Sequence, residues 1–327
     1  MKIVIPGGTG HLGTILTSAF RRRGDEVVLL SRNVEAPARM WDGRTLGDWA
    51  DALDGADVVI NLAGRSVDCR YGQKEKEEIL RSRVDSTRVV GEAIARAKHP
   101  PRLWLQASTA TIYSHRYDAP NDERTGIIGG NEPDAPPEWN FSIDVAKAWE
   151  RALDEARTPI TRKVKMRTAM VMSAESGGAF QALLRHVRLG FGRFGDGRQY
   201  MSWIHERDFF RAIRWLIEND GIDNDVEGAV NLAAPEPLPC EEFLRELREA
   251  WGSTLAVPVS GIVLQIGATL ARTEPELVLK SRRVMPGRLM ELGFGFDFTT
   301  WHDAARDLSA RWRGGVVTAE PQSFPLW

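Results

Sequence analysis

The sequence predicts an α/β protein: a doubly wound parallel sheet covered by helices, followed by a smaller, mainly helical C-terminal domain. Three observations support this fold class. Over the first 175 residues, short apolar runs alternate with longer helical patterns, as in repeated β–α–β units. A glycine-rich turn joins the first apolar run to the first helical pattern. After residue 175 the helical patterns become shorter and Gly, Arg and Pro more frequent, which indicates a second domain.

The elements of the first domain follow from the spacing of their apolar residues. Residues 11–23 carry apolar side chains at helical spacing, and a longer amphipathic stripe runs through residues 72–97. The strands are short runs rich in Val, Ile and Leu, as in parallel sheets buried on both faces. The predicted strands are 2–5, 26–30, 57–60, 102–107 and 164–172, and the predicted helices are 11–23, 72–97 and 140–156.

The domain boundaries are predicted from the change in pattern near residue 175. Residues 1–175 are expected to form the sheet domain, and residues 203–234 are expected to return to it. Segments 176–202 and 235–313 are expected to form the second domain, which includes a helix at 241–251. Residues 314–327 show no periodicity, so we expect an extended tail.

Composition excludes several classes of protein. The 327 residues include 43 Lys and Arg against 45 Asp and Glu, and this balance argues against a nucleic-acid partner. The two cysteines, Cys69 and Cys240, form neither a disulfide framework nor a metal site, and they favour a reducing, cytoplasmic location. No apolar run reaches the roughly 18 residues that span a bilayer, so no membrane partner is expected.

The strongest motif is the turn that reads Gly-Gly-Thr-Gly-His-Leu-Gly from residue 7 to residue 13. It follows a predicted strand and opens a predicted helix, which is the context of a dinucleotide-binding, Rossmann-type turn. Its first glycine permits the tight turn, the next lets the backbone approach a pyrophosphate, and the last lets the helix pack closely. The helix N-terminus then binds the phosphates. Cofactor contacts are expected from Gly7, Gly8, Thr9, Gly10, His11, Leu12 and Gly13.

Two residues at the end of the second predicted strand indicate which dinucleotide is bound. A site for NAD usually carries Asp or Glu there, to bind the ribose 2′-hydroxyl. Here Ser31 and Arg32 occupy the position, and a hydroxyl and a guanidinium suit a 2′-phosphate. NADP(H) is therefore the predicted cofactor. The alternatives are that Glu35 is a displaced acid and that Arg32 is only a surface charge.

Further motifs follow the next two strands: Asn61-Leu62-Ala63-Gly64 and, later, Ser-Thr-Ala-Thr-Ile-Tyr at residues 108–113. With these, the chain resembles the extended short-chain dehydrogenase/reductase superfamily. It is most similar to the atypical sugar-nucleotide epimerase-like branch, the NAD-dependent epimerase/dehydratases with a C-terminal domain of unknown function. The resemblance extends to about Arg313 and implies that Leu62, Ala63 and Gly64 line the cofactor. Segments 69–71, 82–87, 195–205, 231–237, 284–286 and 293–294 also carry it.

The resemblance implies an active site of a Ser or Thr, a Tyr and a Lys. Thr109, with Ser108 beside it, matches the hydroxyl that binds the substrate oxygen. Lys147 matches the lysine that lowers the tyrosine pKa and binds the nicotinamide ribose. The tyrosine position is Ile143, which cannot transfer a proton. The candidates for a replacement acid/base are Tyr113, Tyr71, His115 and Tyr117, of which Tyr113 enters the predicted catalytic set.

Substrate contacts are expected from the second domain and from the loop after the third strand. Arg198 lies in a segment rich in Gly and Arg; the resemblance implies contact with a nucleotide diphosphate, and a solvated loop is the alternative. Arg70 is either an anion contact or a surface ion pair. Tyr71 and Trp203 complete the expected set.

The sequence therefore predicts an NADP(H)-binding epimerase or reductase of the short-chain type. Its substrate is an unidentified small molecule, with a nucleotide sugar as one candidate class, and the second domain is the substrate-side domain. The alternative function is a regulatory or ligand-sensing protein that binds NADP(H) with reduced catalysis, because the tyrosine is missing. A monomer or a homodimer is expected.

Overall fold

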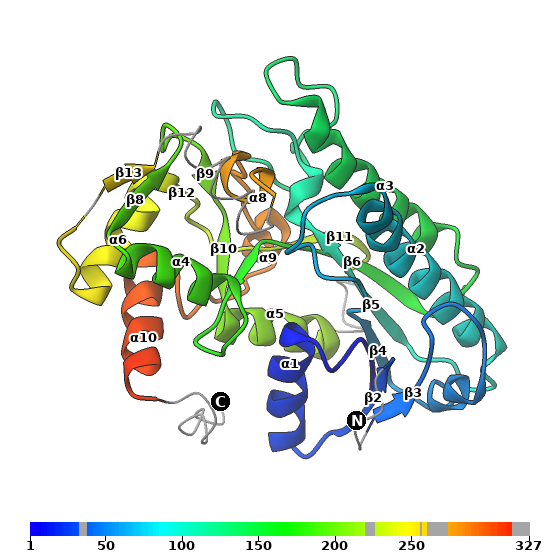
Figure 1. The fold of residues 1–327 in the computed structure, drawn as a ribbon. Helices are drawn as coiled ribbons and strands as arrows, with labels where there is room; N and C mark the ends of the chain where they lie inside the picture. The colour runs from blue at the N-terminus through cyan, green and yellow to red at the C-terminus, as the bar shows by residue number, and fades with distance from the viewer. Residues whose placement is uncertain (33–37, 220–225, 256, 260–273, 316–327) are drawn as a thin grey trace.

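The computed structural model describes residues 1–32, 38–219, 226–255, 257–259 and 274–315. Glu35 and most of the predicted tail lie outside the described residues. A seven-stranded parallel sheet crosses the molecule in the order β11-β6-β5-β4-β1-β2-β3 (Figure 1). Its strands are β1 (Lys2–Pro6), β2 (Glu26–Ser31), β3 (Ala38–Met40), β4 (Val58–Asn61), β5 (Leu103–Thr109), β6 (Arg162–Thr168) and β11 (Gly228–Leu232).

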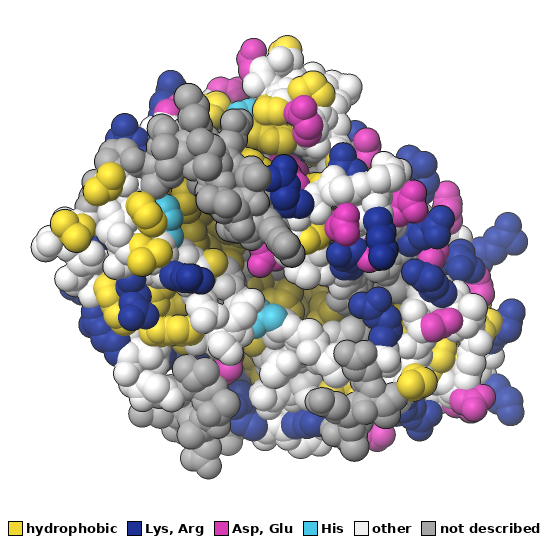
Figure 2. All heavy atoms as spheres, in the orientation of Figure 1, with side chains coloured by type: hydrophobic (Ala, Val, Ile, Leu, Met, Phe, Trp, Pro, Cys, Tyr) yellow, Lys and Arg dark blue, Asp and Glu magenta, His cyan; other side chains and the backbone are white. Residues whose placement is uncertain are grey.

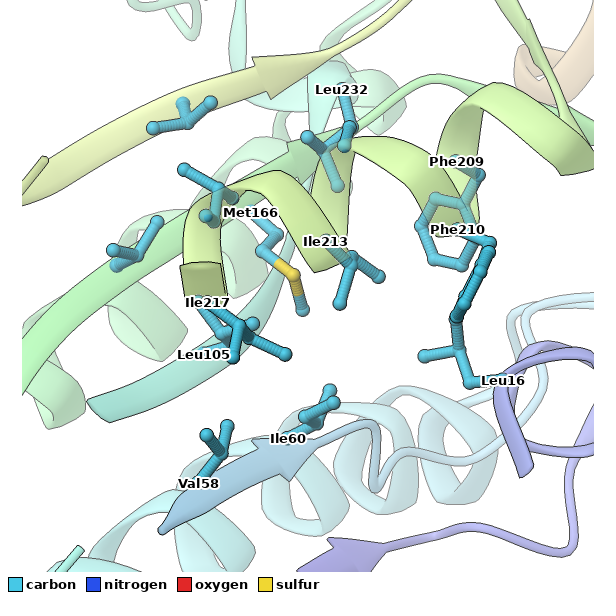
Figure 3. Packing of buried hydrophobic residues seen from close by; sticks show 14 of the residues in the cluster. Leu16, Val58, Ile60, Leu105, Met166, Phe209, Phe210, Ile213, Ile217 and Leu232 are labelled. Atoms are coloured by element: carbon cyan, nitrogen blue, oxygen red, sulfur yellow. The ribbon is translucent and has the colours of Figure 1, made fainter. Parts of the chain in front are cut away.

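Helices cover both faces of this sheet. On one face, α1 (His11–Arg22) and α5 (Glu206–Glu218) pack with the sheet in one hydrophobic cluster. Figure 3 shows Ile213 and other α5 side chains pointing toward Ile60, Leu105 and Met166 of the strands. On the other face lie α2 (Gln73–Arg96) and α3 (Asn140–Asp154), which share a second cluster with the opposite side of the strands. The predicted doubly wound α/β fold is confirmed.

The strand order places the start of the chain at the centre of the sheet. From β1 the chain builds outward to β2 and β3, then returns to the other side of β1 with β4 and continues to β11. The direction of building reverses between β1 and β4, and ligands of open α/β sheets bind at such a point, beyond the carboxyl ends of the strands. The loops after β1, β4 and β5 meet at this edge.

The strand predicted at residues 164–172 is wrong. Residues 164–172 do not form a single strand, because β6 ends at Thr168 and a separate strand, β7 (Met170–Met172), follows. The amide of Ala169 donates to the carbonyl of Leu232, and β7 then leaves the main sheet to pair with β10 (Trp203–His205). The apolar run is continuous, so only the change of pairing partner divides it.

The C-terminal region has its own core, built around an aromatic stack. Trp301 lies 3.9 Å from Phe243, ring centre to ring centre, and 5.1 Å from Trp203. Among the described residues, no helix is both long and apolar enough to cross a bilayer. The remaining elements are α4 (Ala179–Arg188), β8 (Phe191–Phe194), β9 (Tyr200–Met201), β12 (Leu238–Pro239), α6 (Cys240–Trp251), β13 (Val257–Val259), α8 (Glu276–Leu279), α9 (Gly287–Glu291), α10 (Trp301–Arg313) and the 3-10 turns η1 (Asp48–Ala52), η2 (Ala110–Ile112) and η3 (Pro137–Trp139).

Segments from both parts of the chain after residue 200 also pack into the core of the sheet domain. Helix α5 returns to the sheet, and Leu289 and Phe294, far along the C-terminal region, also pack into the sheet-domain cluster. We propose two domains divided near residue 175, with the segment of α9 docked on the first.

Candidate active site

The glycine turn after β1 has the geometry that its sequence predicts. Gly7 has φ +76°, and its amide donates to the carbonyl of Leu30 at 2.9 Å. A Cβ at Gly7 would lie 2.8 Å from the backbone of Ala63, and a Cβ at Gly13 would lie 2.4 Å from the carbonyl oxygen of Gly8. Both positions therefore require glycine, because the neighbouring atoms belong to the backbone and cannot move aside.

The N-terminus of α1 opens from this turn and offers free hydrogen-bond donors. Gly10 is the N-cap, with no side-chain cap and no acidic residue in the first turn. The amide of Thr14 makes the first intrahelical bond, to the carbonyl of Gly10, so the amides before it lie at the open helix end. The buried Nε2 of His11 has no hydrogen-bond partner among the described residues. This arrangement fits a diphosphate, which accepts such bonds and is attracted by the helix dipole.

The predicted determinants of the 2′-phosphate lie next to the turn. The hydroxyls of Thr9 and Ser31 are 3.0 Å apart, which connects the glycine turn to the end of β2. Arg32 follows Ser31 and is exposed. On the other side, the amide of Leu62 donates to the carbonyl of Pro6 at 2.9 Å. The structure thus brings the cofactor residues predicted after β1, β2 and β4 to one edge of the sheet.

A hollow in the molecular surface lies beside this edge. Figure 2 shows it near the centre of the view, with apolar side chains at its base and basic side chains on the surrounding surface. In the orientation of Figure 1, the start of α1 lies at its lower border and the helical domain lies to its left.

Two of the predicted catalytic residues, Thr109 and Lys147, lie near this edge of the sheet. The hydroxyl of Thr109 accepts a hydrogen bond from the amide of Thr111 and caps η2, against which α3 packs. On α3, the amino group of Lys147 donates to the carbonyl of Gly129 at 2.8 Å. Ile143 is one turn earlier, 1% exposed, and packed against the same glycine loop. The tyrosine position is therefore filled by a buried apolar side chain.

Ser108 and Tyr113, both predicted to be catalytic, belong to a buried network. Tyr113 is 2% exposed; its hydroxyl donates to Asn231 at 2.9 Å and accepts from Arg167 at 3.0 Å. The hydroxyl of Ser108 donates to Glu150 at 2.7 Å. Burial also raises the pKa of Tyr113. Both hydroxyls make hydrogen bonds to buried side chains, and we leave them out of the proposed site.

The expected substrate residues separate into two groups. Arg198 is exposed and its guanidinium lies 5.8 Å from the ring centre of Tyr117, and Arg70 is also exposed. Trp203 is fully buried against Trp301, and its indole donates to a backbone carbonyl. It is a core residue, so we remove it from the substrate set.

A buried charged cluster beside Tyr71 was not predicted from the sequence. Glu276, 3% exposed, accepts a hydrogen bond from the hydroxyl of Ser142 at 2.6 Å. Its other carboxylate oxygen lies 3.8 Å from the amino group of Lys280, which also donates to the carbonyl of Thr111. Burial raises the pKa of Glu276, and burial together with Glu276 raises the pKa of Tyr71 to about 12. The sequence offered one signal for this cluster, the i, i+4 spacing of Glu276 and Lys280 in a weakly apolar segment.

This cluster predicts a specific pH dependence of stability. Burial, with Arg282 nearby, lowers the pKa of Lys280 from 10.5 to about 8. Between these values the unfolded chain binds a proton that the folded chain lacks, so stability rises with pH. In urea denaturation, the free energy of unfolding should rise between pH 8 and 10.5, relative to Lys280→Met, by on the order of 2 kcal/mol. A constant difference between the two proteins would contradict the burial of this amino group.

Comparison with known proteins identifies the family. The profile of the NAD dependent epimerase/dehydratase family matches residues 3–233, and that of a domain of unknown function, DUF1731, matches residues 259–308. This chain belongs to the NAD dependent epimerase/dehydratase family. The predicted family, including its C-terminal domain of unknown function, is confirmed.

Relatives within the family match along almost the whole chain. Epimerase family protein SDR39U1 of Bos taurus is 31% identical over 317 residues, covering 95% of this chain and 100% of its own. Epimerase family protein YfhF of Bacillus subtilis is 31% identical over 322 residues, covering 95% and 98%.

Solved structures agree with this membership. The crystal structure of human SDR39U1 with NADPH has a TM-score of 0.81 and 28% identity, covering 95% of this chain and 99% of that one. A nucleoside-diphosphate sugar epimerase from Corynebacterium glutamicum has a TM-score of 0.72 and 27% identity, covering 98% of this chain and 62% of that one.

Proposed function

We propose that this chain binds NADP(H) and acts on a small molecule as an epimerase or reductase of the short-chain type. The observation that carries the proposal is the uncapped N-terminus of α1, beside the Thr9–Ser31 pair and the exposed Arg32. The human relative, whose structure contains NADPH, supports the same choice of cofactor. When bound, the nicotinamide supplies two-electron redox chemistry. Both cysteines are free, and we propose a reducing, cytoplasmic setting.

We assign the remaining roles to residues at the same edge of the sheet. Thr109 would bind a substrate oxygen, and Lys147 would release the carbonyl of Gly129 to bind the nicotinamide ribose. The exposed Arg70 and Arg198 suit a substrate with an anionic group, such as a nucleotide sugar. The sugar epimerase among the similar structures makes that class the first to test.

Replacing Arg32 by Ala tests the cofactor preference. A charge-assisted contact with the 2′-phosphate contributes about 1.5–3 kcal/mol, so the Kd for NADPH should rise roughly 10- to 100-fold. The Kd for NADH should stay within about twofold, because NADH has no 2′-phosphate. Both can be measured by isothermal titration calorimetry, with Arg245→Ala, an exposed arginine on α6, as the matched control. An unchanged NADPH/NADH ratio would remove Arg32 from the cofactor site.

A regulatory function is the second candidate, and the burial of Ile143 favours it. The two functions separate when the protein is incubated with NADPH and a panel of carbonyl compounds and nucleotide sugars. Turnover that Thr109→Ala and Lys147→Ala both lose supports an enzyme. NADPH binding without turnover across the panel supports a regulator.

A further inference from the structure

We infer that Tyr71, Ser142 and Glu276 form a proton-transfer chain that replaces the missing tyrosine at position 143. The inference rests on the proposed function and adds to it the residues that move the proton. Two of the three, Ser142 and Glu276, were not among the residues expected from the sequence.

The loop after β4 holds Tyr71 against the start of α3. The amide of Tyr71 donates to the carboxylate of Glu274 at 2.6 Å, a contact that spans 203 residues of sequence. Its ring packs edge-on against Phe141, with ring centres 5.3 Å apart. Ser142 follows Phe141 and directly precedes Ile143. Tyr71 therefore brings a phenol from a neighbouring loop to the helix turn where the family tyrosine is missing.

A set of polar contacts leads from this phenol into the protein. The side chain of Ser142 interacts with the phenol of Tyr71 and stabilises its phenolate, and the hydroxyl of Ser142 donates to Glu276 Oε2 at 2.6 Å. Glu276 Oε1 is buried and has no hydrogen bond among the described residues. It faces two cations, Lys280 at 3.8 Å and Arg282 at 4.0 Å. The chain thus ends at a carboxyl group that can hold a proton or, opposite these cations, a negative charge.

The same cluster is attached to the strand end that carries Thr109. Lys280 donates to the carbonyl of Thr111 at 3.0 Å, and Arg282 Nε donates to the hydroxyl of Thr111 at 3.1 Å. Thr111 in turn donates its amide to Thr109. The cluster therefore joins four segments beside Thr109: the loops after β4 and β5, the first turn of α3, and the segment around α8.

The proton movements balance in both directions. If the carbon of a substrate carbonyl received a hydride from the bound nicotinamide cofactor, the carbonyl oxygen would take the proton of Tyr71. Tyr71 then takes a proton from Ser142, and Ser142 takes one from the carboxyl of Glu276. The products are an alcohol and a carboxylate at Glu276, which takes up a proton from solvent before the next turnover. Oxidation of an alcohol reverses each transfer.

Two of the other candidate side chains, Tyr113 and His115, are engaged elsewhere. Tyr113 is bonded to Asn231 and Arg167 in the core. His115 accepts the amide hydrogen of Ser281 at its Nδ1, 2.8 Å away, and burial lowers its pKa. Among the described tyrosines and histidines proposed for this role, Tyr71 is the one connected to a buried carboxyl through a hydroxyl.

Fluorine NMR tests the chain without a substrate. The protein has four tyrosines, so fluorotyrosine labelling gives four signals that single Tyr→Phe variants assign. Tyr71 titrates at alkaline pH, where the Glu276 carboxyl has lost its proton, so Glu276→Gln should lower the pKa of Tyr71 by removing a neighbouring negative charge. Ser142→Ala should raise it, because the phenolate loses a hydrogen bond. Glu92→Gln, on an exposed pair of α2, is the control and should leave it unchanged. A Tyr71 titration that is the same in all four proteins overturns the inference.

NADP⁺ and turnover provide the second test. Addition of NADP⁺ should shift the fluorine signal of Tyr71 and leave that of Tyr200 in place. An unmoved Tyr71 signal overturns the proposed proton-transfer chain. Where the carbonyl panel gives turnover, Tyr71→Phe should lower kcat by about 100-fold or more, and Tyr200→Phe should retain it. NADPH affinity should stay within about twofold in both variants. If Tyr71→Phe turns over as fast as the wild type, only the proton-transfer chain is overturned. If the wild type fails to bind NADPH, the proposed function is overturned.

Discussion

Gly10→Ala is expected to weaken NADPH binding by about tenfold or more while leaving the fold as stable as the wild type. Gly10 has φ −77°, which alanine adopts without strain, and a Cβ there would meet only the carbonyl oxygen of Gly7, at 3.4 Å. The added methyl group would instead occupy the side from which a pyrophosphate approaches the backbone. Calorimetric titration with NADPH, paired with urea denaturation, measures both effects.

Gly13→Ala, three residues later, should act on the fold itself. Its Cβ would lie 2.4 Å from the carbonyl oxygen of Gly8, and overpacking of this kind costs about 1–3 kcal/mol. Gly295→Ala, with no heavy atom within 4 Å of its Cβ, is the matched control and should cost far less. NADPH binding that Gly10→Ala leaves intact would argue against a pyrophosphate at this turn. A Gly13→Ala variant as stable as the control would argue against the close packing of α1.

The contrast between these glycines explains why the cofactor turn was predictable. The close approach of Gly13 to Gly8 lies within a few residues of sequence, whereas Gly7 contacts Leu30 and Ala63, and Thr9 pairs with Ser31, across the sheet. Local spacing also predicted α1, α2 and α3 to within two residues at each end. The split between β6 and β7 could not be predicted in this way, because it depends on pairing with Leu232 and Trp203, which are distant in sequence.

The active site was predictable only where its residues belong to one strand or helix. Ser108 and Thr109 are neighbours on β5, and successive side chains of a strand point to opposite faces. The motif identified both residues without showing that Ser108 turns inward to Glu150. Glu276 joins the site through contacts with Ser142 that cross 134 residues of sequence. Its role depends on how the helical domain docks, and no local pattern contains that information.

Arg167→Met is expected to lower the free energy of unfolding by about 3–5 kcal/mol, because it leaves a buried carboxylate without its partner. Two nitrogens of Arg167 each lie 2.8 Å from an oxygen of Glu150, and the two side chains are only 11% and 9% exposed. Tyr113 also loses the Arg167 hydrogen bond to its hydroxyl. Urea denaturation at neutral pH gives the measurement.

Two further variants separate burial from simple loss of charge. Arg88→Met breaks an i, i+4 pair whose side chains are 53% and 40% exposed, so it should cost no more than about 0.5 kcal/mol. The double variant Arg167→Met/Glu150→Leu should recover part of the loss, because no charge is then left buried. If Arg167→Met costs as little as Arg88→Met, Glu150 must reach water when unpaired, and Ser108 and Tyr113 become accessible to ligands again. A large cost instead supports a structural role for these two residues.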